Sequence, residues 1–239
     1  MKKFIVSIDQ GTTSSRVVLF DTKGNIQFIS QYEFKQYFPR NGWVEHNPNE
    51  IWLTTIKALK QVIKKAISLK GQILTIGITN QRETTILWNK KNGKPIYNAI
   101  VWQDRRTQEY CKFLKNKNYE NTFRKKTGLF IDPYFSATKI KWILDNVKIS
   151  KKLLKSNNLL FGTVDTFLIW KLTKGKHHLT EATNASRTML FNINNNKWDN
   201  EILQKLKIPK NILPEVKNSA DNFGKTNKKI VGKEIPISA

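Results

Sequence analysis

The sequence predicts an α/β fold in which helices flank a mixed sheet, formed by residues 1–239 as one domain. Two apolar runs, 4–8 and 17–20, enclose a polar turn with Gly11, a pattern typical of an antiparallel hairpin. Residues 47–71 then repeat apolar side chains at helical spacing, and short apolar runs typical of strands resume at residue 73. A chain of 239 residues is long enough to bury one good core.

Strands and helices alternate along the rest of the chain. Strands are expected at 4–8, 17–20, 25–34, 73–80, 86–88, 99–102, 159–164 and 188–191. Helices are expected at 47–71, 107–114, 119–126, 140–147, 165–172 and 198–206. Asn47 is the expected cap of the first helix and Asp165 that of the fifth, whereas 181–187 is expected to be a polar loop.

The turn between the first two strands, 9–16, consists almost entirely of hydrogen-bonding groups. Four hydroxyls, at positions 12–15, and the Arg16 guanidinium suit a phosphate, and Gly11 lets a ligand approach the backbone. The Asp9 carboxylate suits a hydrated Mg²⁺ beside that phosphate. The turn contains neither of the common phosphate-loop motifs. An ordinary surface hairpin, in which Ser and Thr simply favour turns, is the alternative.

Charged clusters follow two of the later strands, at 81–85 and 102–106. Ligands of open α/β sheets lie where strands end, so Arg82, Glu83 and Trp102 are candidates for one pocket. A carboxylate, a guanidinium and an indole face together suit a polyol, and Tyr134 lies where its hydroxyl could reach the same ligand. The alternative is an exposed Arg–Glu pair beside a tryptophan and a tyrosine that belong to the core.

The chain is strongly basic, with 42 Lys and Arg against 18 Asp and Glu and a net charge of +24. Such a charge is typical of partners such as nucleic acids or anionic membranes. However, only seven of these residues are arginines and the lysines are scattered among Asn and Ile, as a genome rich in A and T would produce. A protein that reads bases would use clustered Arg, so no nucleic-acid partner is expected.

Cysteine and histidine indicate no metal site or nucleophile. Cys111 is the one cysteine, which excludes an internal disulfide and favours a reducing compartment. His46 is expected to be a surface or capping residue, and the neighbours His177 and His178 receive no role. No apolar run reaches 18 residues and the N-terminus does not read as a signal peptide, so we expect a cytoplasmic protein without membrane insertion.

Long strings along the chain resemble the bacterial glycerol kinases, which belong to the FGGY carbohydrate kinases and to the sugar-kinase, heat-shock and actin superfamily. The turn string DQGTTSSR carries the first part of the resemblance. The others are GWVEHNPNEIW (42–52), GITNQRETT (77–85), GKPIYNAIVWQDRR (93–106), TGLFIDPYFSATKIKWILDN (127–146), FGTVDTFLIWKLT (161–173) and TNASRTMLFNI (183–193). Together they extend from Met1 nearly to Ala239.

This resemblance implies a ribonuclease H-like (actin-like ATPase) domain, the first of the two lobes of an FGGY kinase. It also implies transfer of the γ-phosphoryl group of ATP to a terminal hydroxyl of glycerol, with Mg²⁺ as cofactor and family members that form homo-oligomers. The implied nucleotide contacts are Thr12, Thr13, Ser14 and Arg16, with Asp9 on the metal side. The implied glycerol contacts are Arg82, Glu83, Trp102 and Tyr134.

The chain departs from the resembled family in length, because family members are about twice as long. The family's general base, an Asp, and the Gln that holds glycerol would lie beyond Ala239, so no catalytic residue is assigned within this chain. We therefore expect little activity unless a second chain carrying the C-terminal lobe completes the site. A polyol-binding module without catalysis, a kinase of another polyol and a basic nucleic-acid-binding protein are the alternatives.

Overall fold

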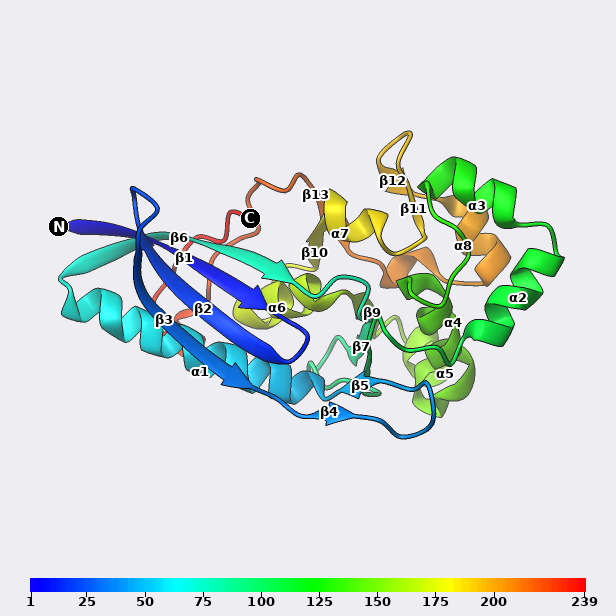
Figure 1. The fold of residues 1–239 in the computed structure, drawn as a ribbon, viewed down its shortest axis with the longest axis horizontal. Coiled ribbons are helices and arrows are strands. Elements are labelled where there is room, and N and C mark those ends of the chain that lie inside the picture. The colour runs from blue at the N-terminus through cyan, green and yellow to red at the C-terminus, as the bar shows by residue number, and fades with distance from the viewer.

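A computed structural model describes residues 1–239, in an elongated molecule with a sheet at one end and a group of short helices at the other (Figure 1). The main sheet has the order β3-β2-β1-β6. Its strands are β1 (Lys2–Gln10), β2 (Ser14–Asp21), β3 (Ile26–Glu33) and β6 (Gly71–Asn80). The first three are antiparallel neighbours, whereas β6 runs parallel to β1, which confirms the predicted mixed sheet.

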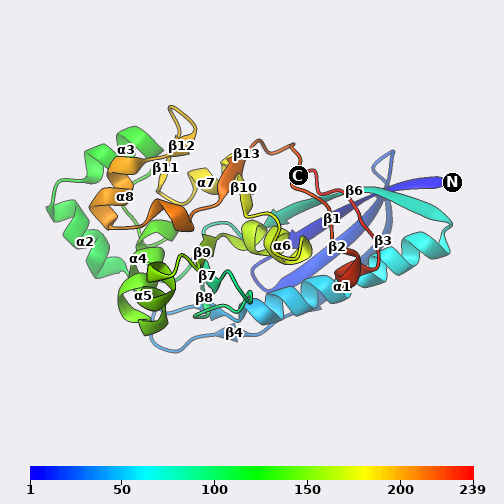
Figure 2. The same ribbon diagram turned by 180° about the vertical axis from the view of Figure 1, so that it is seen from behind.

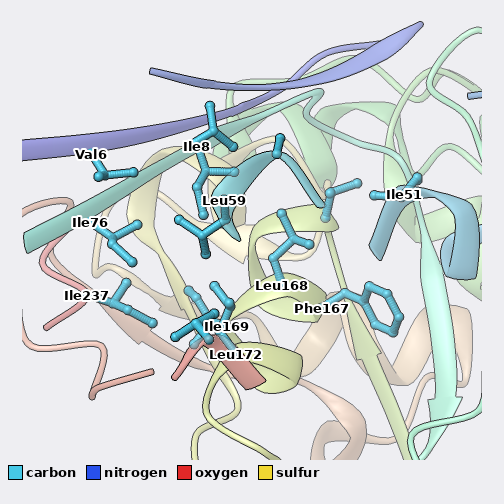
Figure 3. Packing of buried hydrophobic residues seen from close by; sticks show 14 of the residues in the cluster. Val6, Ile8, Ile51, Leu59, Ile76, Phe167, Leu168, Ile169, Leu172 and Ile237 are labelled. Carbon is cyan, nitrogen blue, oxygen red and sulfur yellow. The ribbon is translucent and has the colours of Figure 1, made fainter. Parts of the chain in front are cut away.

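Helix α1 (Pro48–Ser68) makes the crossover that a parallel β1–β6 pair requires. Its predicted cap is confirmed, because the Asn47 side chain accepts a hydrogen bond from the Asn49 N–H at 2.9 Å. The apolar stripe of α1 faces the sheet together with helix α6 (Val164–Leu172), as Figure 2 shows from behind. Figure 3 shows side chains of the strands meeting those of the two helices.

Alternation along the strands decides which residues enter this core. Val6 and Ile8 of β1 are fully buried against the helices, whereas Ile5, which directly precedes Val6, is 38% exposed on the opposite face. Ile29 of β3 lies on that same face and is also exposed. We call β1–β3, β6, α1 and α6 the sheet unit, and a cluster of 28 buried hydrophobic residues forms its core.

A second core of 22 buried hydrophobic residues lies among short helices. These helices are α2 (Gln108–Asn116), α3 (Glu120–Thr127), α4 (Ser136–Asn146), α5 (Lys148–Lys155) and α8 (Asn200–Leu206), which we call the helical unit. The antiparallel pair β7 (Ile86–Asn89) and β9 (Leu159–Gly162) separates the two cores. Trp88 and Leu160 belong to the core of the sheet unit, whereas Leu87 and Phe161 belong to that of the helical unit. Both faces of this two-stranded ribbon are therefore buried.

The remaining elements are short. They are β4 (Gln36–Tyr37), β5 (Glu45–His46), β8 (Ala99–Ile100), β10 (Leu179–Glu181), α7 (Ala182–Ser186), β11 (Phe191–Asn192), β12 (Lys197–Trp198), the 3₁₀ helix η1 (Lys210–Ile212), β13 (Glu215–Lys217) and α9 (Lys228–Val231). After α9 the chain returns to the main sheet, where the Ile78 N–H donates to the Ala239 carbonyl at 2.8 Å. No helix in the structure has both the length and the apolar character needed to cross a bilayer.

Several predicted elements were wrong in detail. Asp165 lies inside α6 rather than at its cap, and its carboxylate instead accepts hydrogen bonds from the hydroxyls of Thr163 and Thr180. The expected loop 181–187 contains helix α7, which the Glu181 side chain caps. The expected strand 188–191 is reduced to Phe191–Asn192, and α5 had not been predicted. In each case a short segment follows its tertiary surroundings rather than its own propensity.

Candidate functional site

The phosphate loop, residues 10–14, joins β1 to β2 at the end of the sheet nearest the helical unit (Figure 1). The Gly11 N–H donates to the Ser14 carbonyl at 2.9 Å and closes the loop. The side chains of Thr12, Thr13 and Ser14 are exposed or half-buried at its rim. Ser15 differs from the expectation, because it is fully buried and its hydroxyl lies 2.9 Å from that of Thr54. The loop therefore presents three hydroxyls rather than four.

Asp9 and Arg16 face each other across the β1–β2 pair that carries the loop. The Arg16 Nε donates to Asp9 Oδ2 at 3.1 Å, and the side chains are 48% and 33% exposed. No group of three or more His, Cys, Asp or Glu side chains converges anywhere in the structure. Asp9 alone could take part in holding Mg²⁺ here, and a single half-exposed carboxylate fits a metal that keeps most of its waters.

Trp102 connects the phosphate loop to the second group of predicted residues. Its indole Nε1 lies 3.3 Å from the Thr12 hydroxyl oxygen and donates to it. Its ring lies 5.3 Å from that of Tyr134, centroid to centroid, at an angle of 54°. The structure thus brings the expected phosphate contact and two expected polyol contacts together, although Thr12 and Tyr134 are 122 positions apart in the sequence.

Glu83 is the buried charge of the site, with only 2% of its surface exposed. Its backbone has φ +64°, a left-handed conformation that non-glycine residues rarely adopt and that often marks a functional position. The Ser136 hydroxyl donates to the Glu83 carbonyl at 3.0 Å, which ties this turn to the start of α4. The strained turn directs the carboxylate inward.

Arg187 is the partner of that carboxylate and was missed in the sequence. Its Nε donates to Glu83 Oε1 at 2.6 Å, and its guanidinium lies 5.7 Å from the centroid of the Tyr134 ring. Arg187 lies at the end of α7, in a segment expected to be a polar loop. Only its place inside the string TNASRTMLFNI could have singled it out, because its partner is 104 residues away.

Arg82 precedes Glu83 in the same turn but is exposed, whereas Glu83 is buried. Arg82 lines a pocket of about 430 Å³ together with Asn80, Glu181 and Asn184. Ala239 lines the same pocket, so the chain ends at this wall of the site. The structure therefore places Arg82 and Glu83 on two different walls.

Tyr134 is held by its own backbone at the mouth of α4. Its N–H donates to Asp132 Oδ1 at 2.8 Å, and the Lys139 ammonium donates to its carbonyl. Lys139 is fully buried, and this burial lowers its pKa to about 7 although Asp104 and Glu83 act in the opposite direction. The tyrosine ring itself stays half-buried and lines a groove of about 400 Å³ that also includes Arg187. The ring is thus fixed in place but open to a ligand.

Two of the remaining expectations concern Cys111 and His46. Cys111 is buried, and burial raises the pKa of its thiol to about 11, so no thiolate nucleophile is available. The expectation that His46 is a surface or capping residue was wrong, because its side chain is completely buried behind the phosphate loop. The residue lies in β5, where its imidazole faces inward between Gln36 and Gln81.

Comparison with known proteins supports the resemblance along the whole chain. The FGGY family of carbohydrate kinases, N-terminal domain, matches residues 4–239. A glycerol kinase of Petrotoga mobilis is 54% identical over 238 residues, which cover 100% of this chain and 48% of that protein. The crystal structure of Plasmodium falciparum glycerol kinase with ADP is 38% identical, has a TM-score of 0.95 and is matched over 48% of its length.

More distant relatives show the fold alone. The xylulose kinase of Rhodospirillum rubrum has a TM-score of 0.89 at 15% identity, again with 48% of its length covered. The chain thus spans about half the length of the relatives that it matches. Since the family match extends over nearly every residue, this chain belongs to the FGGY family of carbohydrate kinases, of which it forms the N-terminal domain.

Proposed function

We propose that this chain is the phosphate-binding and glycerol-binding half of an ATP-dependent glycerol kinase. The observation that carries the proposal is the continuous series of contacts from Thr12 through Trp102 and Tyr134 to Arg187 and Glu83. This series connects the phosphate loop, through two aromatic rings and Arg187, to the buried carboxylate of Glu83. The 54% identity to a glycerol kinase supports glycerol as the polyol.

Each part of the pocket has a role in holding glycerol. The Glu83 carboxylate accepts hydrogen bonds from two neighbouring hydroxyls, while the Arg82 guanidinium donates to their oxygens from the other wall. The rings of Trp102 and Tyr134 cover the C–H edge of the polyol. Arg187 holds the Glu83 carboxylate in one orientation through its hydrogen bond at 2.6 Å.

The phosphate loop positions the group that is transferred. The hydroxyls of Thr12, Thr13 and Ser14 and the Arg16 guanidinium donate to phosphate oxygens, and Asp9 would hold Mg²⁺ through water. Bound Mg²⁺ supplies charge neutralisation on the phosphate oxygens. A terminal glycerol oxygen forms a bond to the γ-phosphorus as the bond to the β–γ bridging oxygen breaks. The proton of the attacking glycerol hydroxyl passes to a base outside residues 1–239. Residues 1–239 therefore contribute by positioning the two substrates.

Glycerol binding is the direct test of the pocket. Glu83→Gln keeps the size of the side chain but removes the charge, and we expect it to weaken glycerol binding about tenfold or more. Isothermal titration calorimetry with glycerol measures this loss. Glu109→Gln, which changes an exposed glutamate of α2, is the matched control and is expected to bind as the unmodified chain does. Equal affinities for glycerol in both variants would contradict the proposed pocket.

Turnover tests the division of the enzyme into halves. We expect formation of glycerol 3-phosphate from ATP and glycerol only when the C-terminal half of the Petrotoga mobilis relative is added to this chain. Turnover by the chain alone would contradict a missing base. Glycerol binding without turnover in either case would favour the second candidate, a polyol-binding module without catalysis.

A further inference from the structure

A network of buried polar side chains lies behind the phosphate loop. Gln10 and His46 are completely buried and Gln81 nearly so, while Gln36 is half-buried. These residues come from β1, β5, the end of β6 and β4, so the network crosses four separate segments. Buried polar groups of this kind are costly unless each one finds a partner.

The hydrogen bonds of the network have a defined direction. Gln36 Nε2 donates to the Thr12 carbonyl at 3.0 Å, which leaves Gln36 Oε1 to accept from His46 Nε2 at 2.5 Å. The Thr84 hydroxyl donates to Gln81 Oε1 at 3.0 Å, so Gln81 Nε2 is a donor. Its two hydrogens face three acceptors, the Gly11 carbonyl at 3.0 Å, Gln10 Oε1 at 3.1 Å and His46 Nδ1 at 3.3 Å. His46 therefore carries its proton on Nε2 and accepts at Nδ1.

The network holds two consecutive carbonyl groups of the loop. The Gly11 carbonyl accepts from Gln10 Nε2 at 2.7 Å and from Gln81 Nε2 at 3.0 Å. The Thr12 carbonyl accepts from Gln36 Nε2. Because a trans peptide places the carbonyl of one residue opposite the N–H of the next, both N–H groups at positions 12 and 13 point away from the network. Neither of them donates to an atom of the chain.

We infer that His46 is a positioning residue for nucleotide binding: through Gln36 and Gln81 it turns the Gly11 and Thr12 carbonyls inward and thereby directs the Thr12 and Thr13 amides at a phosphate of the nucleotide. The inference rests on the proposed function, because it names what holds the phosphate loop of that site. Successive outward N–H groups bind an anion, so the arrangement suits a phosphate.

The ionisation state of His46 is consistent with this role. Burial lowers its pKa to about 4, although Glu50 acts in the opposite direction, so the imidazole is neutral near pH 7. A proton on Nδ1 would face the Gln81 amide N–H and break the connection. The neutral ring keeps one donor and one acceptor in place throughout the physiological range.

Three substitutions separate the two hydrogen bonds. His46→Asn keeps an acceptor near the position of Nδ1, His46→Gln keeps a donor near the position of Nε2, and His46→Leu keeps the bulk but neither function. The matched control is His178→Gln. His178 is half-buried, and its Nε2 lies 2.7 Å from the Phe161 carbonyl, outside the network.

The first measurement needs no ligand. Amide hydrogen exchange of Gly11, whose N–H closes the loop, is expected to become about tenfold faster in His46→Leu, with smaller changes in the Asn and Gln variants. Exchange of Val6 in β1 is expected to stay unchanged, as is that of Gly11 in His178→Gln. Unchanged Gly11 exchange in His46→Leu would overturn the inference, whether or not the chain binds a nucleotide.

The second measurement separates this role from a loss of stability. In the chain completed by the C-terminal half of the Petrotoga mobilis relative, we expect His46→Leu to raise the KM for ATP about tenfold while the KM for glycerol changes less than twofold. In His46→Asn and His46→Gln the KM for ATP should lie between that of His46→Leu and that of the unmodified chain. A parallel rise of both KM values would overturn the inference. Absence of turnover with unmodified His46 would contradict the proposed function, and the exchange measurement would still decide the role of His46.

Discussion

The sheet unit and the helical unit bury cores of similar size but are built in different ways. The sheet unit uses long elements, such as strands of 8 to 10 residues and the 21-residue helix α1. The helical unit uses helices of only 7 to 11 residues. Short helices are marginal by themselves, so the helical unit depends more on tertiary contacts.

The candidate site combines elements of both kinds. The phosphate loop is a local feature of one hairpin in the sheet unit. The proposed polyol pocket instead gathers Glu83, Tyr134 and Arg187 from the turn after β6, the start of α4 and the end of α7. The comparison shows that a site built from consecutive residues can be recognised locally, whereas a site assembled between units requires the fold.

Trp88 tests whether the two units fold together, and it carries the largest expected effect. Trp88 is fully buried in the ribbon between the cores, where its ring contacts those of Phe167 and Trp170 edge to face. Trp88→Ala is expected to lower the free energy of unfolding by about 3–5 kcal/mol, the usual cost of removing a large buried aromatic side chain. Urea unfolding followed by circular dichroism measures the loss.

The shape of the transition distinguishes one cooperative body from two. Since Leu87 and Trp88 face opposite cores, we expect a single transition at a lower urea concentration. Trp52→Ala, at a half-buried position of α1, is the control and should cost less. Two separate transitions in Trp88→Ala would mean that the units unfold independently.

The same contrast explains what the sequence could predict. The hairpin, α1 and the Asn47 cap were predicted because long periodic runs and a Pro at the first helical turn are local signals. Asp165 resembled a cap but satisfies two buried hydroxyls instead, a role that depends on β10 lying beside α6. His46 looked like a loop histidine because nothing local reveals that Gln36 and Gln81 lie on either side of its ring.

The site residues show the same contrast between local signals and contacts with distant segments. The turn alone made the hydroxyls of the phosphate loop candidates but left an ordinary surface hairpin open, and it did not reveal that Ser15 is buried. For Arg82, Glu83, Trp102 and Tyr134 the residue chemistry left a core or surface explanation open, and only the long resemblance favoured a pocket. Arg187 could not be named at all, since its partner lies 104 residues away. Long-range ion pairs leave no trace in local composition.

The two units should also respond to pH in different ranges. In the helical unit, burial lowers the pKa of Lys139 to about 7, below the usual value of a free lysine. Between pH 7 and about 10 the unfolded chain binds a proton at this site that the folded chain does not, so stability rises with pH in this range. We expect the chain to gain about 2 kcal/mol between pH 7 and 9, from about 1.4 kcal/mol per unit.

The Lys139 variant isolates this effect from the titration of other groups. Urea unfolding at pH 7 and pH 9 should show the gain in the unmodified chain and not in Lys139→Met, which keeps the length of the side chain. His46, which lies in β5 behind the phosphate loop of the sheet unit, acts in the range from pH about 6.5 down to 4, where the unfolded chain takes up a proton first and stability falls as the pH falls. An equal rise between pH 7 and 9 in Lys139→Met would show that Lys139 is not the source.

The smallest predicted effect concerns how the short helices end. Gly128 follows α3 with φ +74°, and its N–H donates to the Arg124 carbonyl at 2.8 Å, which is a left-handed C-cap. A Cβ at this position would lie 3.2 Å from Ile193 Cδ1, so Gly128→Ala adds a close contact to a strained backbone. We expect a loss of about 1 kcal/mol in the free energy of unfolding, measured by urea denaturation.

Gly128→Asn provides the matched comparison, because asparagine adopts the left-handed conformation more readily than alanine while its Cβ occupies the same space. If backbone strain dominates, Gly128→Asn should cost less than Gly128→Ala. If the contact with Ile193 dominates, the two variants should cost the same, and the helical unit would then depend on packing at its helix ends more than on their caps.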